Sequence, residues 1–250
     1  MRVLVVTAVA AEAKAVTAGI TRYAASGTRE LTGGYEVAGF AQFVPRPGSV
    51  QIPVLDVLAG GVGPTAAAVA TATALAASPY DPPYHLVVSA GIAGGFPPHA
   101  PIGSLVVSDT IIAADLGAET PDGHLPVEEL GFGRSVHHPP AELTARMAEV
   151  LNADPVTSAV LAPVLTLSTV TGTSARAAAL AARHPRAAAE AMEGFGVAEA
   201  AAAHSVPCVE IRAISNAVGP RDRGSWQIGP ALDSLRHAFA LLTPVFEEPS

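Results

Sequence analysis

The sequence is poor in cysteine, in lysine and in charge of either sign. Its single cysteine, Cys208, cannot form a disulfide within the chain, and this usage is typical of a reducing cytoplasm. We therefore expect a cytoplasmic protein. Cys208 lies in an apolar stretch, which favours a small buried side chain over a reactive thiol.

Few basic residues are present to bind a polyanion. Lys14 is the only lysine and the formal net charge is −8, whereas a nucleic-acid surface needs a basic patch or stripe. No apolar run reaches the roughly 18 residues of a membrane span, and residues 1–9 lack the features of a signal peptide. We expect neither a nucleic-acid nor a membrane partner.

Histidines gather in one segment without the spacing of a metal site. His124, His137 and His138 fall within residues 120–140, and the adjacent pair has no third ligand at metal-binding spacing. A solvated loop is the better interpretation of this segment. We expect no metal and no cofactor.

Half of the residues are hydrophobic and only 14% are charged, so the chain can bury a sizeable core. Apolar β-branched runs and Ala-rich stretches predict an α/β fold, and no repeat or linker divides the chain, so we expect residues 1–250 to form one domain. The expected strands are 2–6, 35–44, 50–59, 85–90, 102–113, 164–170 and 209–216. The expected helices are 10–18, from the glycines at 60–63 to about 77, 140–151, 175–182, 197–203 and 230–246. Residues 26–34, 45–48, 120–140 and 216–228 are expected turns or loops.

Polar side chains stand where predicted strands end. Glu193 lies between a small apolar stretch and an Ala-rich helix, and the strand 209–216 carries polar residues at its C-terminal end. Ligands of open α/β sheets bind at this end of the strands. The pattern predicts two adjacent crossover units that direct polar side chains to one site. Glu12 follows a strand too, although a helix N-terminus alone would favour an acid there.

Two glycine-rich segments, 60–66 and 91–96, also follow strands. Glycines let the backbone approach a ligand, and the helix after the first segment offers free N–H donors. The first segment nominally satisfies the dinucleotide pattern G-x-G-x-x-A, but the acid about 20 positions on, Asp81, precedes a strand instead of ending one. No lysine marks a phosphate-binding loop. These segments predict a turn close to a sugar or another oxygen-rich ligand, with plain strand–helix packing as the close alternative.

Four motifs together resemble a known superfamily. In chain order they are Gly60-Gly61-Val62-Gly63, Gly91-Ile92-Ala93-Gly94-Gly95, Ala191-Met192-Glu193-Gly194 and Arg212-Ala213-Ile214-Ser215-Asn216. Their order and spacing are similar to those of the nucleoside phosphorylases and nucleosidases. Within that superfamily the chain looks most like the futalosine hydrolases, and it also resembles the methylthioadenosine/S-adenosylhomocysteine nucleosidases. The similarity spans nearly the whole chain. It implies a three-layer sandwich around a mixed, mostly parallel sheet, and cleavage of the N-glycosidic bond between a purine and ribose.

The resemblance implies catalytic roles for two carboxylates. Departure of the purine leaves an oxocarbenium-like sugar, so the site must hold the ribose and position a nucleophile. Glu193 matches the residue that accepts hydrogen bonds from ribose hydroxyls, and Glu12 matches the acid that orients and activates the attacking water. Met192 matches a residue packed on the sugar, with plain core packing as an equal alternative. Arg212 matches an arginine near the acid.

Asn216 departs from the nucleosidases of adenine compounds, which carry Asp at this position. A carboxyl group can protonate N7 of the leaving purine, whereas an amide donates and accepts at once and so reads the O6 and N7 edge of a 6-oxopurine. The Asn resembles the arrangement of phosphorylases that use inosine and guanosine. It indicates a hypoxanthine leaving group, which futalosine carries. Ser215 matches a small polar support beside the base.

Four further positions complete the expected substrate-binding set. Val170 and Thr171 match a segment whose backbone borders the purine, and Gly94 belongs to the second glycine-rich segment. Ile92 stands where adenine-type nucleosidases often have Ser, and it dries that side of the sugar pocket.

The expected partner is a small-molecule purine nucleoside, and hydrolysis is favoured because neither glycine-rich segment has a phosphate-binding arginine nearby. The alternatives are a methylthioadenosine/S-adenosylhomocysteine or aminodeoxyfutalosine nucleosidase, a purine nucleoside phosphorylase, and, from another class, a non-catalytic nucleotide-binding protein. The presence of both Glu12 and Glu193 argues against simple binding. The resemblance also implies a homo-oligomer, a dimer or a multiple of it, with the loop around Phe132 and the helix after Gly63 as the contact.

Overall fold

The computed structural model describes residues 1–41, 54–78 and 83–247. Its strands are β1 (Val3–Thr7), β2 (Ala24–Leu31), β3 (Tyr35–Ala41), β4 (Leu55–Ala59), β5 (Leu86–Gly95), β6 (Leu105–Ala113), β7 (Gly117–Thr120), β8 (Gly123–Pro126), β9 (Val136–His137), β10 (Ala159–Thr166), β11 (Ala189–Ala191) and β12 (Cys208–Ala217). Its helices are α1 (Ala10–Gly19), α2 (Pro64–Ala76), α3 (Ala141–Ala153), α4 (Ser174–Arg183), α5 (Gly194–Ala203) and α6 (Ile228–Leu242), with short 3-10 turns η1 (Arg223–Ser225) and η2 (Val245–Glu247).

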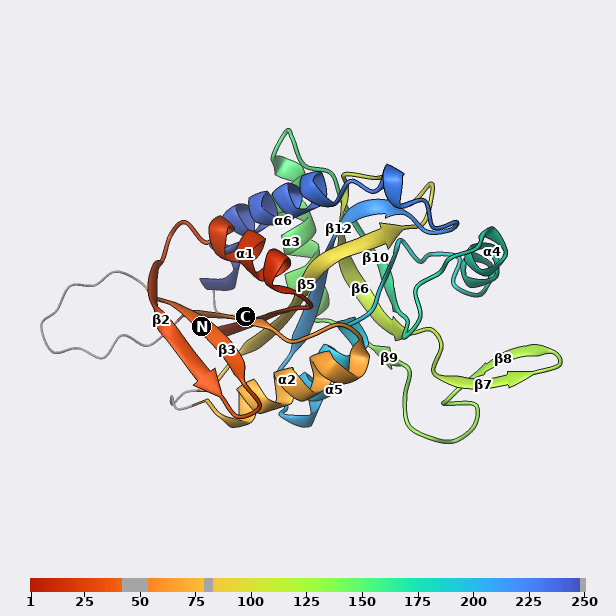
Figure 1. Ribbon diagram of the computed structural model, residues 1–250, viewed down its shortest axis with the longest axis horizontal. Helices are drawn as coiled ribbons and strands as arrows, with labels where there is room; N and C mark the ends of the chain where they lie inside the picture. The colour runs from red at the N-terminus through yellow and green to blue at the C-terminus, as the bar shows by residue number, and fades with distance from the viewer. Residues whose placement is uncertain (42–53, 79–82, 248–250) are drawn as a thin grey trace, which may run out of the picture.

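A mixed sheet forms the middle layer of the protein. Within the described residues it has ten strands in the order β11-β10-β6-β12-β5-β1-β4-β3-β2, with β9 beside β6. Helices α1, α3 and α6 cover one face and α2 and α5 cover the other (Figure 1). The expected three-layer α/β architecture around a mixed sheet is therefore confirmed.

The alternation of side chains along β1 shows how both faces become buried. Val3 and Val5 pack with residues of α1, α3 and α6, whereas Leu4 and Val6 pack with α2 and α5. Successive side chains of a strand point to opposite faces, so a continuous apolar run suits a strand covered on both sides. This is why the uninterrupted run at the N-terminus correctly predicts a central strand.

The strands around the site close on one another. The short β11 pairs in parallel with β10 and antiparallel with β5. Between these two strands the sheet continues from β10 through β6 and β12 to β5, each paired with the next. The ring β11-β10-β6-β12-β5 therefore has no free edge. It brings β11 and β12, which are not paired with each other in this ring, to either side of the C-terminal half of β5.

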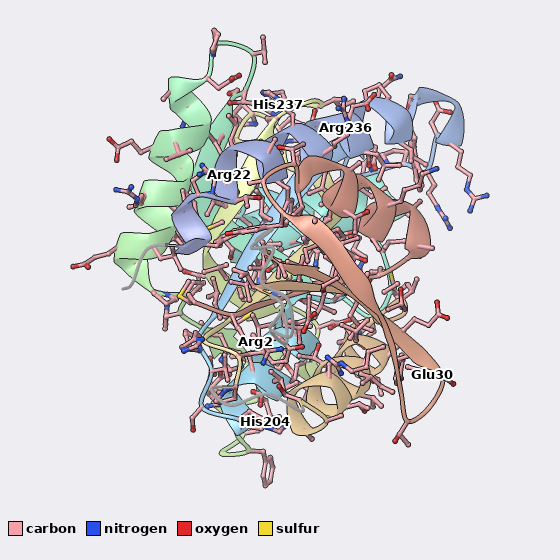
Figure 2. The ribbon with its side chains drawn as sticks, turned by 90° about the vertical axis from the view of Figure 1, so that its left-hand side faces the viewer. Arg2, Arg22, Glu30, His204, Arg236 and His237 are labelled. Carbon is pink, nitrogen blue, oxygen red and sulfur yellow. The ribbon has the colours of Figure 1, made fainter. Side chains whose placement is uncertain are left out.

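Arg2 forms an ion pair inside the fold, away from this ring. Its guanidinium lies 3.0 Å from an Asp56 carboxylate oxygen and 4.3 Å from the centre of the Tyr84 ring. Figure 2 shows Arg2 within the body of the molecule and Glu30 at the outer end of the β2–β3 hairpin. Arg2 precedes β1 and Asp56 lies in β4, so the pair links these two neighbouring strands of the sheet.

Two segments expected to be irregular contain strands. Residues 26–34 were predicted as a turn-rich connection, but most of them belong to β2, and only residues 32–34 form the turn to β3. β2 is an edge strand with mostly exposed side chains, so its polar composition hides it. Residues 120–140 contain β8 and β9: β8 forms a hairpin with the preceding β7 that projects from the body (Figure 1), and β9 pairs with β6.

The remaining differences concern boundaries. β5 continues through the glycines to Gly95, where the strand was expected to stop at residue 90; the strand expected at 164–170 is β10, which lies earlier; and α6 ends at Leu242 before the separate turn η2. The expected turn at 45–48, the strand residues 42–44 and 50–53, and Asp81 lie outside the described residues. Across the described ranges, every helix is too short or too polar to cross a membrane.

Candidate active site

A cavity of about 360 Å³ lies where β5, β11 and β12 meet the segment 218–226. This volume is in the range of small-molecule sites. Every residue expected in the site lines the cavity except Arg212. The lining residues are Ala8, Val9, Glu12, Val62, Ile92, Ala93, Gly94, Val170, Thr171, Glu190, Ala191, Met192, Glu193, Ser215, Asn216, Val218, Arg221 and Trp226.

Glu12 is held by three backbone N–H groups. It lies in the first turn of α1, where Oε2 accepts from the N–H groups of Ala8 (3.0 Å) and Val9 (3.2 Å). Oε1 accepts from the N–H of Ile92 on β5 at 2.8 Å. The connection between β1 and α1, together with β5, therefore fixes the carboxylate of Glu12. This carboxylate is buried except where it lines the cavity. Such fixed geometry is what a group that orients a reacting water requires.

Gly91 makes room for two charged groups to approach each other. A Cβ atom added at Gly91 would lie 2.6 Å from Glu12 Oε1 and 2.8 Å from Arg212 Nη1. Any larger residue would displace either the carboxylate or the guanidinium. The glycine-rich segment therefore serves close packing of charged side chains at this position, beyond any approach of the backbone to a ligand.

Glu193 is the residue immediately before α5, at the end of β11. Its Oε1 accepts from the N–H of Gly63 at 3.2 Å, and its Oε2 lies 3.2 Å from Arg212 Nη1. Gly63 has a φ of 91°, a conformation that glycine adopts without strain. The first glycine-rich segment thus presents a backbone donor to the carboxylate that was expected to bind ribose.

Arg212 lies behind the cavity, where its side chain has no exposed surface. Its guanidinium donates from Nε to Glu210 Oε1 (2.8 Å), from Nη1 to Glu193 and from Nη2 to Ser89 Oγ (3.0 Å). Arg212 was expected among the substrate-binding residues. Because Arg212 is buried and does not line the cavity, it can influence a bound substrate only through Glu193 or Glu12.

One guanidinium therefore serves three buried carboxylates. Burial raises the pKa of Glu12, and the neighbouring Glu193 raises it too, while the Ile92 N–H and Arg212 lower it. Burial likewise raises the pKa of Glu210, whose Oε1 accepts from Arg212 and whose buried Oε2 has no hydrogen-bond partner among the described residues. A single cation cannot balance three ionised carboxylates in a dry interior, so proton uptake by this cluster is favoured.

The opposite side of the cavity carries amide and hydroxyl groups. The Oδ1 of Asn216 accepts from Ser215 Oγ at 2.8 Å, and its Nδ2 donates to the carbonyl of Ala217 at 3.0 Å. Ser215 therefore orients the amide, as the support role expected for it requires. Thr171 lies nearby in the cavity wall and donates to Glu190.

The mouth of the cavity includes Arg221 and Trp226 from the segment after β12. The Arg221 guanidinium lies 5.6 Å from the centre of the Trp226 ring, and Arg223 lies 6.0 Å from it on the exposed side. Both Arg221 and Trp226 line the cavity. An aromatic face with a cation beside it suits a flat or anionic substituent on the ligand.

The strand arrangement that was predicted to bring the polar residues to one site was wrong in one respect. β11 and β12 were predicted as adjacent crossover units whose C-terminal ends share one mouth. β12 is parallel to β5, but β11 is antiparallel to it, so the two strands run in opposite directions. Glu193 and Asn216 meet at one cavity because both strands flank β5 within the closed ring, and β11 is only three residues long.

Sequence reasoning missed Glu190 and Glu210 as members of the site. Glu190 lies between two alanines in β11, and Glu210 lies between Val209 and Ile211 in β12. Buried carboxylates are rare unless paired, so an acid in such a run was the available signal. His137 was expected in a solvated loop, but its Nε2 lies 3.0 Å from Glu199 Oε1 and its ring is partly buried. Over the described part of the chain, no group of three or more His, Cys, Asp or Glu side chains is placed to hold a metal ion.

Comparison with known proteins identifies related sequences along most of the chain. The family model of the phosphorylase superfamily matches residues 2–242. A futalosine hydrolase of Streptomyces coelicolor is 62% identical over 193 residues, which cover 77% of this chain and 80% of that protein. A futalosine hydrolase of Acidothermus cellulolyticus is 44% identical over 250 residues, with 96% of this chain and 89% of the relative covered.

Solved structures share the fold at lower sequence identity. The futalosine hydrolase of Helicobacter pylori superposes with a TM-score of 0.77 at 17% identity, covering 99% of this chain and 97% of the other. A methylthioadenosine/S-adenosylhomocysteine nucleosidase of Colwellia psychrerythraea, in complex with adenine, gives 0.75 at 23% identity, with 98% and 94% covered. These likenesses show the fold.

Replacement of Glu210 by Gln tests the shared charge of the cluster. The folded-state pKa of Glu210 is raised above its ordinary value of 4.5, so its contribution to stability is present below that pH and is lost as pH rises through the raised pKa. The Tm of the wild type minus that of Glu210→Gln should therefore fall between pH 4.5 and pH 8. Calorimetry at several pH values measures it, with the exposed Glu149→Gln as the control for loss of one charge. A difference that rises with pH would mean that Glu210 is stabilised as a carboxylate.

Proposed function

Because the chain belongs to the phosphorylase superfamily, and within it to the family of the futalosine hydrolases, we propose that it hydrolyses the N-glycosidic bond of futalosine. The products are hypoxanthine and dehypoxanthine futalosine, in the alternative route to menaquinone. The observation that carries this proposal is the pair Glu12 and Glu193, which line one cavity beside the buried Arg212. We place the protein in the cytoplasm, because its single cysteine, Cys208, suits a reducing environment.

Glu193 and Glu12 have different roles at the sugar. Glu193 accepts hydrogen bonds from the ribose hydroxyls, and this contact strengthens as positive charge develops on the ring. Glu12 holds a water and takes its proton as the water oxygen attacks C1′. The bond from C1′ to N9 breaks, and its electron pair leaves with the purine. The raised pKa of Glu12 brings its proton affinity closer to neutrality, which suits a general base.

Asn216 acts on the leaving base. Its amide has no proton to release as an acid, so it stabilises the departing 6-oxopurine by hydrogen bonds to O6 or N7. Ser215 keeps the amide in one orientation. Met192, Ile92 and Gly94 give the cavity an apolar wall against the nucleoside, and Val170 with Thr171 borders the base.

Hydrolysis is favoured over phosphorolysis by the charge of the cavity. Among its described lining residues, Arg221 is the single basic side chain, and it lies at the mouth beside Trp226. A phosphate at the sugar would meet the carboxylates Glu12 and Glu193 without a cation in direct contact. Water is neutral and is oriented by the same carboxylates.

Product analysis tests the proposed activity. The protein is incubated with futalosine, inosine and methylthioadenosine, each with and without phosphate, and the released bases and sugars are separated. We expect hypoxanthine and a free sugar from futalosine in phosphate-free buffer. A phosphate requirement with formation of a sugar 1-phosphate would make the protein a phosphorylase, and binding without any released base would make it a non-catalytic binding protein.

Substitution of the two carboxylates separates their roles. Glu12→Gln should lower kcat by about 10²–10⁴-fold with little change in KM, because the amide keeps the size of Glu12 but cannot take a proton. Glu193→Gln should raise KM and lower kcat together, because the ribose contact exists before and during cleavage. Steady-state kinetics with futalosine measures both, with Glu149→Gln as the control. Near-wild-type turnover in Glu12→Gln would remove Glu12 from the mechanism.

Asn216→Asp should move base preference towards adenine. The 6-amino group of adenine is a donor, and a carboxylate accepts from it, whereas the Asn216 amide offers it a second donor. One unpaired buried polar group costs about 1–3 kcal/mol, or roughly one to two decades in specificity. The ratio of kcat/KM for futalosine and its 6-amino analogue is measured in the wild type, in Asn216→Asp and in the control Asn152→Asp. An unchanged ratio in Asn216→Asp would show that Asn216 does not read the base.

We propose a homo-oligomer with closed symmetry, a dimer or a multiple of it. The helix α5 lies between α2, whose Val69 is 52% exposed, and the loop of Phe132, which is 73% exposed. Apolar side chains are therefore uncovered on both sides of α5. Sedimentation at micromolar concentration should give at least a dimer, and Phe132→Ser should weaken it. A wild-type monomer at that concentration contradicts the proposal.

A further inference from the structure

Three residues of the cavity lie in one row across the sheet. In the pairing of β11 with β5, Glu190 lies opposite Gly94, and in the pairing of β12 with β5, Asn216 lies opposite the same glycine. Residues opposite each other on neighbouring strands project to the same face. Since adjacent strands are about 4.8 Å apart and the ring is curved, the Cα atoms of Glu190 and Asn216 are less than about 10 Å apart.

Gly94 lies between these two side chains in the cavity wall. All three residues line the cavity. A Cβ atom added at Gly94 would lie 3.3 Å from Asn216 Nδ2 and 3.0 Å from a methyl group of Val218. The lack of a side chain at Gly94 therefore lets Asn216 pack close to β5, and a carboxylate and a carboxamide border the same cavity from the strands on either side of this glycine.

Glu190 adds acceptor oxygens to the cavity wall and occupies the donors of Thr171. Its Oε1 accepts from the backbone N–H of Thr171 at 2.6 Å, and its Oε2 accepts from the Thr171 hydroxyl. The N–H of Thr171, a residue of the cavity wall, is thus occupied. A carboxylate has about four lone-pair positions, so Glu190 keeps acceptor capacity for a ligand. Burial raises its pKa, and both Thr171 hydrogen bonds oppose that rise because they favour the ionised form.

Asn216 supplies the matching donor. Its Oδ1 is occupied by the Ser215 hydroxyl, and one N–H of its Nδ2 is given to the carbonyl of Ala217. An amide nitrogen carries two hydrogens, so the second is available to a ligand. The row therefore offers an acceptor from β11 and a donor from β12.

This rests on the proposed function: we propose that Glu190 is a specificity-determining residue that accepts from N1–H of a 6-oxopurine, while Asn216 donates to O6. N1–H and O6 are adjacent in hypoxanthine and form a lactam edge, with one donor and one acceptor. In adenine both are reversed, because N1 is an acceptor and the 6-amino group is a donor. The site therefore rejects adenine at two atoms, and Asn216 alone accounts for only one.

Binding of free bases tests this assignment separately from catalysis. Dissociation constants of hypoxanthine, 1-methylhypoxanthine and adenine are measured by calorimetry for the wild type, Glu190→Gln, Glu190→Leu and the control Glu199→Gln, which lies on α5 away from the cavity lining. In the wild type, methylation of N1 should weaken binding roughly 10- to 100-fold, because a hydrogen bond to a charged acceptor is lost.

The variants should follow the acceptor strength of residue 190. Glu190→Leu removes the acceptor and frees the N–H of Thr171, which suits N1 of adenine. The preference for hypoxanthine over adenine should therefore fall roughly 10- to 100-fold. Glu190→Gln retains an acceptor oxygen and should be intermediate, whereas Glu199→Gln should match the wild type.

Two results would overturn the assignment. One is a folded Glu190→Leu protein, checked by circular dichroism, that keeps the wild-type preference for hypoxanthine. The other needs no variant: a wild type that binds 1-methylhypoxanthine as tightly as hypoxanthine has no N1–H acceptor. If the wild type hydrolyses futalosine but shows either result, only the role of Glu190 fails. If it neither hydrolyses futalosine nor binds hypoxanthine, the proposed function fails with it.

Discussion

The arrangement of the site depends on one buried cation. The guanidinium of Arg212 contacts Glu193 and Glu210 directly and faces Glu12 across Gly91. Removing one partner of a buried ion pair costs about 3–5 kcal/mol, because it leaves an uncompensated charge. Here Arg212 holds Glu193 in place, while burial of Glu12 and the charge of Glu193 raise the pKa of Glu12 against the lowering effects of the Ile92 N–H and Arg212. The proposed division between a ribose-binding carboxylate and a water-activating carboxylate follows from these two effects.

The closed ring of strands makes this cluster possible. Glu12 comes from α1, Glu193 from the end of β11 and Arg212 from β12, and β5 lies between them. Two glycines of β5 allow close packing in the site: Gly91 admits the carboxylate of Glu12 and the guanidinium of Arg212, and Gly94 lets Asn216 and Val218 pack close to the strand. A sheet with a free edge at β11 would not hold the two sides of the cavity at a fixed separation. The polar groups of the site are therefore mounted on paired strands, which gives them the rigidity that a catalytic site requires.

Much of this arrangement can be predicted from local sequence patterns, and the rest depends on long-range pairing. The β-branched run of β1 and the Ala-rich run of α5 have strong local signatures, and the resemblance to the superfamily predicts one site for Glu12, Glu193 and Asn216, which line one cavity. The direction of β11 cannot be read locally, because a three-residue strand takes its direction from its partners. Glu190 was missed because only the fold brings Thr171 beside it, whereas Glu210 and Arg212 lie two residues apart on one face of β12, a spacing that the sequence does offer as a signal. The edge strand β2 was missed because a polar strand and a turn-rich loop have similar composition.

The coupling between Glu12 and Glu193 is tested most directly by the pH dependence of kcat/KM. Glu12 must be ionised to take a proton, so activity falls on the acid side as pH drops through its raised pKa. Burial and the charge of Glu193 both raise that pKa. Glu193→Gln removes a negative charge that raises the pKa of Glu12, and it leaves the positive charge of Arg212 less compensated. The pKa of Glu12 should therefore fall, and the acid limb should move to lower pH even though the rate is reduced. An acid limb at the same pH in both proteins would contradict the account, because it would mean that the group controlling activity does not share the field of Arg212 and Glu193.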